Sequence, residues 1–531
     1  MWRPTTELSG NAKTLLICAT LATANIFSGY DTASAAAVIA DQSFIDTFHL
    51  SASMKGAFAS LINVGNCLAY LGPLVFFSKW FGRRWTMVIG DLALMAGASL
   101  VAGSRNEAML LVGRVLCGLG VSLCQGTFAA WTSEIASAEI RGTAIALVQV
   151  SYQIGVFVAF WISLGTAKLP NNLSWRTLTA IQMAFGAILL VCTLLAPESP
   201  RQLLNRAEDP TDMLDPKVRL ARDNHLSLRK LPEGDVRLEG EWTAMQTDVM
   251  RQRAAAIYGS PLQLLRQRNV WRRILIGAGS CIFAQLTGVA ALMLYGITVF
   301  QSLNLGGKQL SLIINGLGGS LQLVACFMPL FLSDRWGRRN IMLFGIAVAW
   351  IGYLFLGALF ERWPDAQNRG AGVWMVICIF AIQCAYAGAL GSACIVLSAE
   401  IWPQALRDFG ISVSFLGLFI TVIVVNQLWP VLSDALTFRL YWVMLGINTV
   451  TFITVFLFWP ETKLLSLEQM DQVMGSIEAR ASLTRLPDAF ISDDGEQVGG
   501  SDDKAGAVAV ASLRAAASPA AEMKDAKGDV K

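Results

Sequence analysis

The chain has 531 residues, of which 54% are hydrophobic and only 15% are charged, whereas charged residues make up about a quarter of an average soluble domain. This composition excludes an ordinary water-soluble globular protein and predicts a chain embedded in a lipid bilayer. The net charge of +3 is too small to indicate a nucleic acid partner. All ten cysteines, from Cys18 to Cys394, lie in apolar runs, so we expect neither disulfide bonds nor a metal or other cofactor.

Twelve apolar runs follow one another along the chain, each close to the roughly 20 residues that a helix needs to cross a bilayer. They cover residues 14–40, 57–77, 85–103, 108–130, 140–164, 178–196, 274–300, 310–332, 341–360, 373–398, 411–432 and 440–459. The first run is longer than the apolar core of a signal peptide, so we interpret it as a retained helix. The pattern predicts an all-α membrane protein with 12 transmembrane helices.

The short loops after the second and eighth runs are basic. They contain Lys79, Arg83, Arg84, Arg335, Arg338 and Arg339. Because positively charged loops stay on the cytosolic side of a membrane, these loops are predicted to be cytosolic. An even number of spans then places both termini in the cytosol, and we expect the plasma membrane as the location.

Only two histidines are present, His49 and His225, and both lie in polar segments. We expect both to be solvent-exposed loop residues. With no nucleophile and base pair in the sequence, an enzyme is not expected. Asp91, in the third run, is a charge inside the membrane to which the sequence assigns no role.

Three motifs recur in the same order in the two halves of the chain. The octapeptide SKWFGRRW begins at Ser78 and SDRWGRRN begins at Ser333, an offset of 255. The motifs PESPR and PETK recur at an offset of 263. A glutamate seven residues before an arginine recurs at an offset of 266, as Glu134 with Arg141 and as Glu400 with Arg407. Such repetition indicates a duplicated six-helix half, as in many secondary transporters.

The duplication and the composition divide the chain into five predicted segments. These are a cytosolic N-terminus (1–13), a first six-helix bundle (14–201), a cytosolic linker with short helices (202–269), a second six-helix bundle (270–463) and a cytosolic tail (464–531). The tail becomes rich in Ala, Gly, Asp and Lys and is predicted to be largely disordered after about residue 480.

Several further strings occur at matching places. In chain order they are Gly29-Tyr30-Asp31, Gly82-Arg83-Arg84, Gly113-Arg114, Gln149, Pro197 to Arg201, Gln285 with Gly288, Gly337-Arg338-Arg339, and Pro460 to Lys463. Together these motifs resemble the sugar-porter family of the major facilitator superfamily, particularly its fungal members, over about residues 14–474. The resemblance implies two pseudo-symmetric six-helix bundles that transport a small-molecule solute by alternating access. We expect the protein to act as a monomer.

Asp31 is the most informative charge inside the membrane, because a lone buried carboxylate is costly and is functional by default. The family resemblance pairs it with Arg114 in the fourth helix. Protonation of Asp31 would break this pair and link proton occupancy to movement of the first half. Proton symport is therefore expected, although passive transport stays open.

The resemblance also implies a cytosolic gate. Its residues would be Arg83, Arg84, Glu134 and Arg141 in the first half, and Asp334, Arg338, Arg339, Glu400 and Arg407 in the second. Such a charge cluster can hold one conformation and release in another, here the outward-open state. Lys79 stands where the family usually has Asp, so we hypothesise a weaker latch in the first half, because a lysine cannot accept hydrogen bonds from arginines. The alternative is that the arginines serve only membrane topology.

The substrate site is where the sequence departs from the family. Gln149 and Gln285 match usual sugar ligands. The usual first glutamine of helix 7 is Ala284, and Val289 and Ala290 fill both positions at which an asparagine is expected. In helix 10, Ile395 stands where the family usually has an aromatic residue that forms a platform for the sugar. Both hinge prolines of the family are also missing from this helix.

Other polar residues are candidates to complete the site. Gln322 and Asn426 could line the same cavity with their amides, or make ordinary contacts between helices. Tyr295 is a candidate gate aromatic, with packing as the alternative.

The sequence thus favours a transporter of a sugar or polyol. A transporter or exporter of a less polar metabolite is the first alternative, because the departures make the cavity wall apolar. A nutrient sensor that does not transport is the second.

Overall fold

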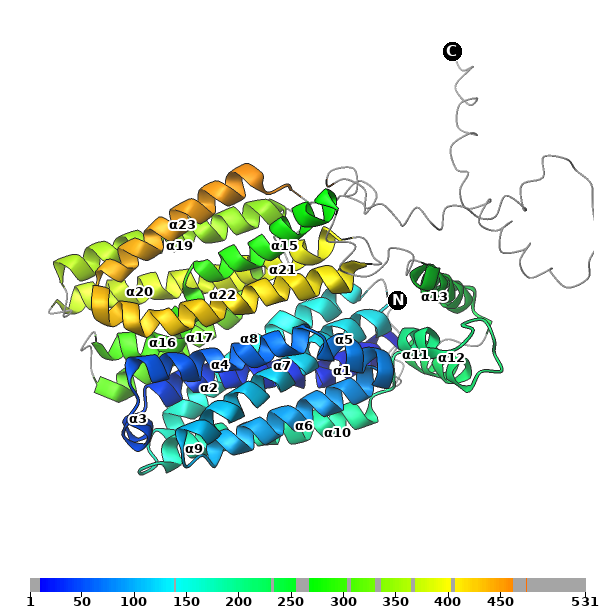
Figure 1. Cartoon of the computed structure of the whole chain (residues 1–531), viewed down its shortest axis with the longest axis horizontal. Coiled ribbons are helices and arrows are strands. Elements are labelled where there is room, and N and C mark those ends of the chain that lie inside the picture. Colours follow the sequence, from blue (N-terminus) through cyan, green and yellow to red (C-terminus); the bar gives the residue numbers. More distant parts are fainter. Residues whose placement is uncertain are drawn as a thin grey trace, which may run out of the picture. The chain divides into compact units, whose positions relative to one another are not determined.

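The computed structural model describes residues 10–137, 140–230, 234–254, 267–302, 307–329, 336–363, 368–402, 406–461 and 474. Every regular element within these ranges is a helix (Figure 1). The predicted disordered tail lies outside the described residues.

The described residues of the first half form ten helices. They are α1 (Gly10–Leu21), α2 (Thr23–Ile39), α3 (Gln42–Phe48), α4 (Ala52–Tyr70), α5 (Pro73–Phe81), α6 (Arg83–Ala102), α7 (Glu107–Ile135), α8 (Arg141–Thr166), α9 (Leu173–Ala180) and α10 (Gln182–Leu195). Several of these helices have a polar residue at the N-cap position. Ser51 accepts from the backbone N–H of Met54 at α4, and Asn106 does the same for Met109 at α7. These side chains satisfy donors that a helix start leaves without partners.

The described helices of the second half run from residue 268 to residue 458. They are α15 (Arg268–Leu286), α16 (Val289–Ser302), α17 (Gly307–Ala325), α19 (Arg338–Arg362), α20 (Arg369–Ala385), the π-helical turn η2 (Tyr386–Leu390), α21 (Gly391–Glu400), α22 (Arg407–Leu436) and α23 (Arg439–Phe458).

Ten helical segments in the described ranges are long and apolar enough to cross a membrane. The other two predicted runs, the second and the eighth, correspond to α4 with α5 and to α17. Both are interrupted at equivalent places. The chain leaves the helix at Leu71 in the first half and turns at Cys326 in the second, an offset of 255 that matches the repeated octapeptide.

The helices α6 and α7 pack very closely. A Cβ atom added at Gly120 of α7 would lie 2.5 Å from the carbonyl oxygen of Gly90 in α6. Small residues allow membrane helices to approach at backbone distance, where van der Waals packing holds them together. This pair is therefore a tightly fitted part of the first half.

The two halves meet along three helix pairs, α4 with α22, α8 with α17, and α2 with α16 (Figure 1). We call the end that holds the repeated arginines of α6 and α19 the basic end, and the opposite end the far end. At the far end a single apolar cluster joins both halves and includes Val38 and Phe160 with Leu292 and Phe300. At the basic end the first half has its own cluster, which includes Met87. A further cluster joins Tyr70 of α4 to Phe419 of α22, so apolar contacts between the halves are not confined to the far end.

The linker forms three further helices, α11 (Pro200–Arg206), α12 (Pro216–Arg229) and α13 (Val236–Ala254). The helices α11 and α12 contact the basic end of the first half, and α13 packs against both of them. Lys13 Nζ donates to the carbonyl of Ser227 at 2.8 Å, and Arg229 Nη1 donates to the carbonyl of Ile135 at 2.9 Å. These contacts join the linker to the start of α1 and the end of α7.

The expectation of an exposed His225 is wrong, because this side chain is 1% exposed between α12 and α13. Its ring lies 5.9 Å from that of Trp242. Burial, and then the cation of Arg229, lower the pKa of His225 from 6.5 to about 4, against the opposing effect of Glu241. The surrounding apolar residues of the linker hold the imidazole in its neutral form.

We predict that the packing of α12 and α13 weakens in acid. Because the folded linker keeps His225 neutral, its stabilisation is fully present above about pH 6.5 and is lost as the pH falls through about 4. Hydrogen exchange of residues 216–229 should therefore accelerate over this interval. His225→Gln should remove that part of the acceleration, and an unchanged pH dependence in the variant would contradict the assignment.

Candidate functional site

A buried ion pair joins α2 and α7 in the first half. Arg114 Nη1 lies 3.0 Å from both carboxylate oxygens of Asp31, and the two side chains are 4% and 2% exposed. Arg114 Nε donates to the carbonyl of Phe58 at 3.2 Å, and the Phe58 ring centroid lies 4.6 Å from the guanidinium carbon. The desolvation of a charge pair inside a bilayer is offset only when its remaining donors and acceptors are also hydrogen-bonded. Removal of one partner is strongly destabilising, because it leaves an unpaired buried charge.

A third helix also reaches this pair. Gln182 of α10 donates from Nε2 to Asp31 Oδ1 at 3.1 Å and to Ser34 Oγ at 2.9 Å. The sequence analysis did not identify Gln182, although an isolated amide in an apolar run is a usable signal. Asp31 therefore links α2 to α7 and α10, so a change in its charge alters contacts among three helices.

Three of the predicted gate residues of the first half, Arg83, Arg84 and Glu134, lie around the start of α6. Arg83 Nη2 lies 2.6 Å from Glu134 Oε1, and Ser199 Oγ donates to Glu134 Oε2 at 2.5 Å. Glu198 accepts from the backbone N–H of Arg83 at 3.1 Å and from that of Arg84. A carboxylate at a helix N-terminus is favourable for the helix dipole. Arg84 itself donates to the carbonyl of Leu194.

The second half repeats this arrangement. Arg338 Nη2 lies 2.9 Å from Glu400 Oε1, and Glu461 Oε1 accepts from the backbone N–H of Arg338 at 2.9 Å. Arg339 donates to the carbonyl of Phe456. Asp334 lies outside the described residues, as do the side chains of Arg141 and Arg407.

The geometry explains the glycine of the repeated motif. Gly82 has a φ of 89° and Gly337 a φ of 88°, a backbone region that favours glycine. A Cβ atom at Gly82 would lie 2.8 Å from Glu198 Oε2, and one at Gly337 would lie 2.5 Å from Glu461 Oε2. The glycine thus makes room for the carboxylate that caps the following helix.

Lys79 is exposed at the end of α5. Arg83 instead finds an acceptor in the neighbouring Ser78, whose Oγ lies 2.5 Å from Nη1. The effect of Lys79 on the latch stays a prediction.

Several buried amide side chains lie inside the second half. Gln322 of α17 donates to Gln383 Oε1 of α20 at 3.3 Å, and Gln383 Nε2 lies 3.4 Å from the carbonyl oxygen of Leu292. Gln285 donates to the hydroxyl of Tyr386 at 2.6 Å. Asn315 lies on the same helix as Gln322 and is 3% exposed. We call Gln285, Asn315, Gln322, Gln383 and Asn426 the amide group.

Part of the hydrogen-bonding capacity of this group is unfilled. Three atoms of this group have no hydrogen-bond partner among the described residues, although each residue is at most 5% exposed. They are Gln322 Oε1, Asn315 Nδ2 and Asn426 Oδ1. Buried polar atoms in folded proteins nearly always have partners. These atoms are therefore suited to a polar ligand.

The remaining predicted substrate residues are placed differently. Tyr295 donates to the backbone carbonyl of Asn426 at 3.1 Å, so its hydroxyl joins α16 to α22. Gln149 is half-buried on α8. Sequence reasoning missed Gln383 and Asn315, because no motif marks them.

The tenth span, which lacks the hinge prolines of the family, is irregular between α20 and α21. The turn Tyr386–Leu390 is π-helical and directly precedes Gly391. Single π-helical turns occur frequently at functional sites. Of the other departures, Ala284 and Val289 are 1% and 0% exposed and belong to apolar clusters.

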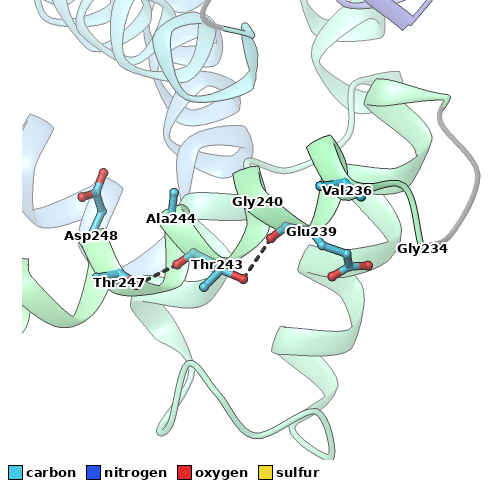
Figure 2. Close-up of a pocket in the computed structure, with 8 residues that line it drawn as sticks. All are labelled: Gly234, Val236, Glu239, Gly240, Thr243, Ala244, Thr247 and Asp248. Atoms are coloured by element: carbon cyan, nitrogen blue, oxygen red, sulfur yellow. Dashed lines mark hydrogen bonds between the residues drawn. The ribbon is translucent and has the colours of Figure 1, made fainter. Parts of the chain in front are cut away.

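A surface hollow lies on the linker, away from these residues. Figure 2 shows its lining, which comes from α13 and the turn before it and includes Glu239, Thr243 and Asp248. A hollow with one helix as its wall cannot enclose a solute, so we do not assign it to the substrate.

Two halves with repeated charge motifs, and polar groups buried between their helices, define a secondary transporter of the major facilitator type. The chain belongs to the sugar (and other) transporter family, whose model matches residues 17–474. Members of this family carry solutes across membranes, so the protein is a multi-pass membrane transporter and not an enzyme.

Two curated transport proteins are similar to this chain over most of its length. A probable quinate permease of Aspergillus terreus is 26% identical over 490 residues, which cover 88% of each chain. The sugar transport protein MST2 of Oryza sativa subsp. japonica is 27% identical over 484 residues, covering 86% of this chain and 90% of the relative.

A solved structure confirms the predicted fold. The proton:xylose symporter XylE of E. coli, a major facilitator superfamily protein, is similar with a TM-score of 0.71 at 20% sequence identity. The match covers 87% of this chain and 100% of that chain. The fold is therefore that of the major facilitator superfamily.

Proposed function

We propose that the protein transports a neutral, polyhydroxylated solute, a sugar or a polyol, together with protons by alternating access. The observation that carries this proposal is the amide group with its unfilled donors and acceptors. A hydroxylated solute needs several such partners in exchange for its hydrogen bonds to water. Amides supply both donors and acceptors without charge.

The charge of the amide group argues for a neutral solute over an anion such as quinate. A carboxylate in a buried site needs a cation or several strong donors. Among the described residues of the spans, the buried cations are Arg114 and Arg273. Arg114 is bonded to Asp31, and Arg273 donates to the carbonyl of Ile401. Neither is among the contacts of the amide group.

Proton coupling is supported by the pair of Asp31 with Arg114. A proton on Asp31 would remove the negative charge that Arg114 and Gln182 now contact, and would favour a rearrangement of α2, α7 and α10. The name of XylE, a proton:xylose symporter of the same fold, agrees with this mechanism.

The ion pairs at the basic end are proposed to act as the gate. Arg83 with Glu134, and Arg338 with Glu400, hold the arginines in defined positions within each half. When the halves close at this end, the same arginines would latch them together and stabilise the outward-open state. With this orientation, both termini face the cytosol of a plasma-membrane protein that acts as a monomer.

A second candidate is export of a less polar metabolite. It is favoured by the apolar residues at sugar-ligand positions, since Ala284 and Val289 are buried in apolar clusters and Ile395 packs against one. An apolar wall recognises an apolar ligand surface.

Uptake assays with a variant of the amide group test the proposal. In vesicles, labelled hexose uptake should be inhibited by excess unlabelled polyol and not by quinate. Gln322→Leu should weaken apparent hexose affinity by about 5-fold to 150-fold, because it removes the unfilled acceptor Oε1 and leaves a hydroxyl of the solute unpaired, at a cost of about 1–3 kcal/mol. Asn66→Leu is the matched control, because Asn66 is a buried membrane amide of the first half that donates to Asn63 Oδ1 at 3.3 Å and accepts from Ser122 Oγ at 2.9 Å.

The control should keep the affinity of the wild type. Inhibition by quinate alone would refute the neutral solute. Indifference to hexose, combined with export of a lipophilic metabolite, would favour the second candidate.

A further inference from the structure

A second carboxyl group lies inside the first half. Asp91, on α6, is 0% exposed, and no described residue donates a hydrogen bond to either of its carboxyl oxygens. Asp31 differs in this respect, because Arg114 and Gln182 both donate to it. The two acids therefore meet opposite environments within one bundle.

The neighbours of Asp91 along its helix face are apolar. Met87, four residues before it, belongs to the cluster of the basic end together with Cys124 and Leu189. Leu94, three residues after it, packs with Phe27 and other apolar side chains of α7 and α10. Because residues three and four apart share a helix face, Asp91 lies between two apolar layers.

No described cation lies where it could neutralise this acid. The helices α5, α7, α9 and α10 pack against α6. Their titratable groups nearest to Asp91 include Cys124 of α7, whose thiol donates to the carbonyl of Met87 at 3.6 Å, and α10 contributes Cys192. Arg176 of α9 donates to the carbonyl of Ser104 at the far end of α6, and Lys79 of α5 is exposed.

The remaining arginines are distant and bonded elsewhere. Arg83 is eight residues before Asp91 on α6, which is about 12 Å along the helix, and pairs with Glu134. Arg114 pairs with Asp31 and is ten residues from Cys124 on α7, about 15 Å along that helix.

An isolated carboxylate cannot remain ionised in such a place, because its transfer from water into an apolar interior costs far more than taking up a proton. We propose that Asp91 is a second proton-binding site of the transporter, and that it carries a proton in the conformation described here. Its release requires water to reach α6 through the apolar cluster of the basic end, which includes Met87. The proposal adds an acid to the proposed proton coupling, but occupancy of Asp91 does not depend on which solute is carried.

Infrared spectroscopy of the purified full-length protein tests this directly. A protonated carboxylic acid has a carbonyl stretch that separates from other protein bands and shifts in heavy water. We expect this band near neutral pH in the wild type, unchanged in Asp31→Asn, and lost in Asp91→Asn. The Asp31 variant is the matched control, because it removes the other membrane acid of the same bundle.

Two further outcomes are decisive. Identical spectra of the wild type and Asp91→Asn would overturn the proposal, because the carboxyl would then be ionised. If Asp91→Asn does not fold, Asp91→Glu retains an acid, and a displaced carbonyl band supports the proposal whereas an unchanged spectrum overturns it. Because the assay needs no solute, it can fail while hexose transport succeeds, and the reverse.

Discussion

Arg114→Ala is expected to lower the free energy of unfolding by about 3–5 kcal/mol. The substitution removes the guanidinium that contacts both oxygens of Asp31, and it leaves a carboxylate that is 2% exposed with the amide of Gln182 as its remaining described donor. The measurement is thermal unfolding of the purified protein in detergent. Additional loss comes from the contact with the carbonyl of Phe58.

A double variant separates the charge effect from lost packing. Asp31→Asn combined with Arg114→Gln replaces the pair by two neutral amides and should recover most of the lost stability, because neither partner leaves an unpaired charge. If Arg114→Ala unfolds at the wild-type temperature, the pair is not the buried structural element described here.

Asp31→Asn is expected to abolish accumulation of solute against a gradient while it spares exchange. Asparagine has a similar shape but cannot take up a proton, so the solute would move without a proton and only toward equilibrium. The measurement compares proton-driven uptake with counterflow in vesicles, in which labelled solute exchanges for unlabelled solute and no proton movement is needed.

Two controls define this prediction. Asp46→Asn removes an exposed acid of α3 that accepts a hydrogen bond from Gln42, and should leave both activities intact. Asp31→Glu keeps a titratable group and should restore part of the coupling. Loss of counterflow in Asp31→Asn, with normal folding, would instead assign Asp31 to solute movement itself.

The course of the membrane spans could be predicted from the sequence, because apolar length is a direct requirement of the bilayer. The interruption of the second and eighth spans could not. Leu71 and Cys326 lie inside runs that hydropathy treats as continuous, and the breaks depend on local backbone geometry. Their common offset becomes meaningful only once both halves are described.

The site was predictable where a charge or a motif marked it. Asp31 and the repeated arginines carry strong physical signals, since ions in or beside a membrane are costly. Gln182, Asn315 and Gln383 carry only the weak signal of an amide in an apolar run, which does not tell which group lies across from it in the fold. Asp91 is the same residue type as Asp31, and tertiary packing alone distinguishes them.

The absent hinge prolines show a further limit. The tenth span lacks them, yet the chain forms a π-helical turn at Tyr386–Leu390. Such a turn follows from packing around one extra residue rather than from a residue type, so no composition rule detects it.

Gradient-driven uptake by the purified wild-type protein in liposomes tests the central claim most directly. With an inward proton gradient and labelled hexose outside, the account predicts accumulation above the external concentration that collapses when a protonophore is added. Hexose that only equilibrates, with the same rate in the presence and absence of the gradient, would contradict proton-coupled transport, and absence of any hexose flux would contradict the proposed solute.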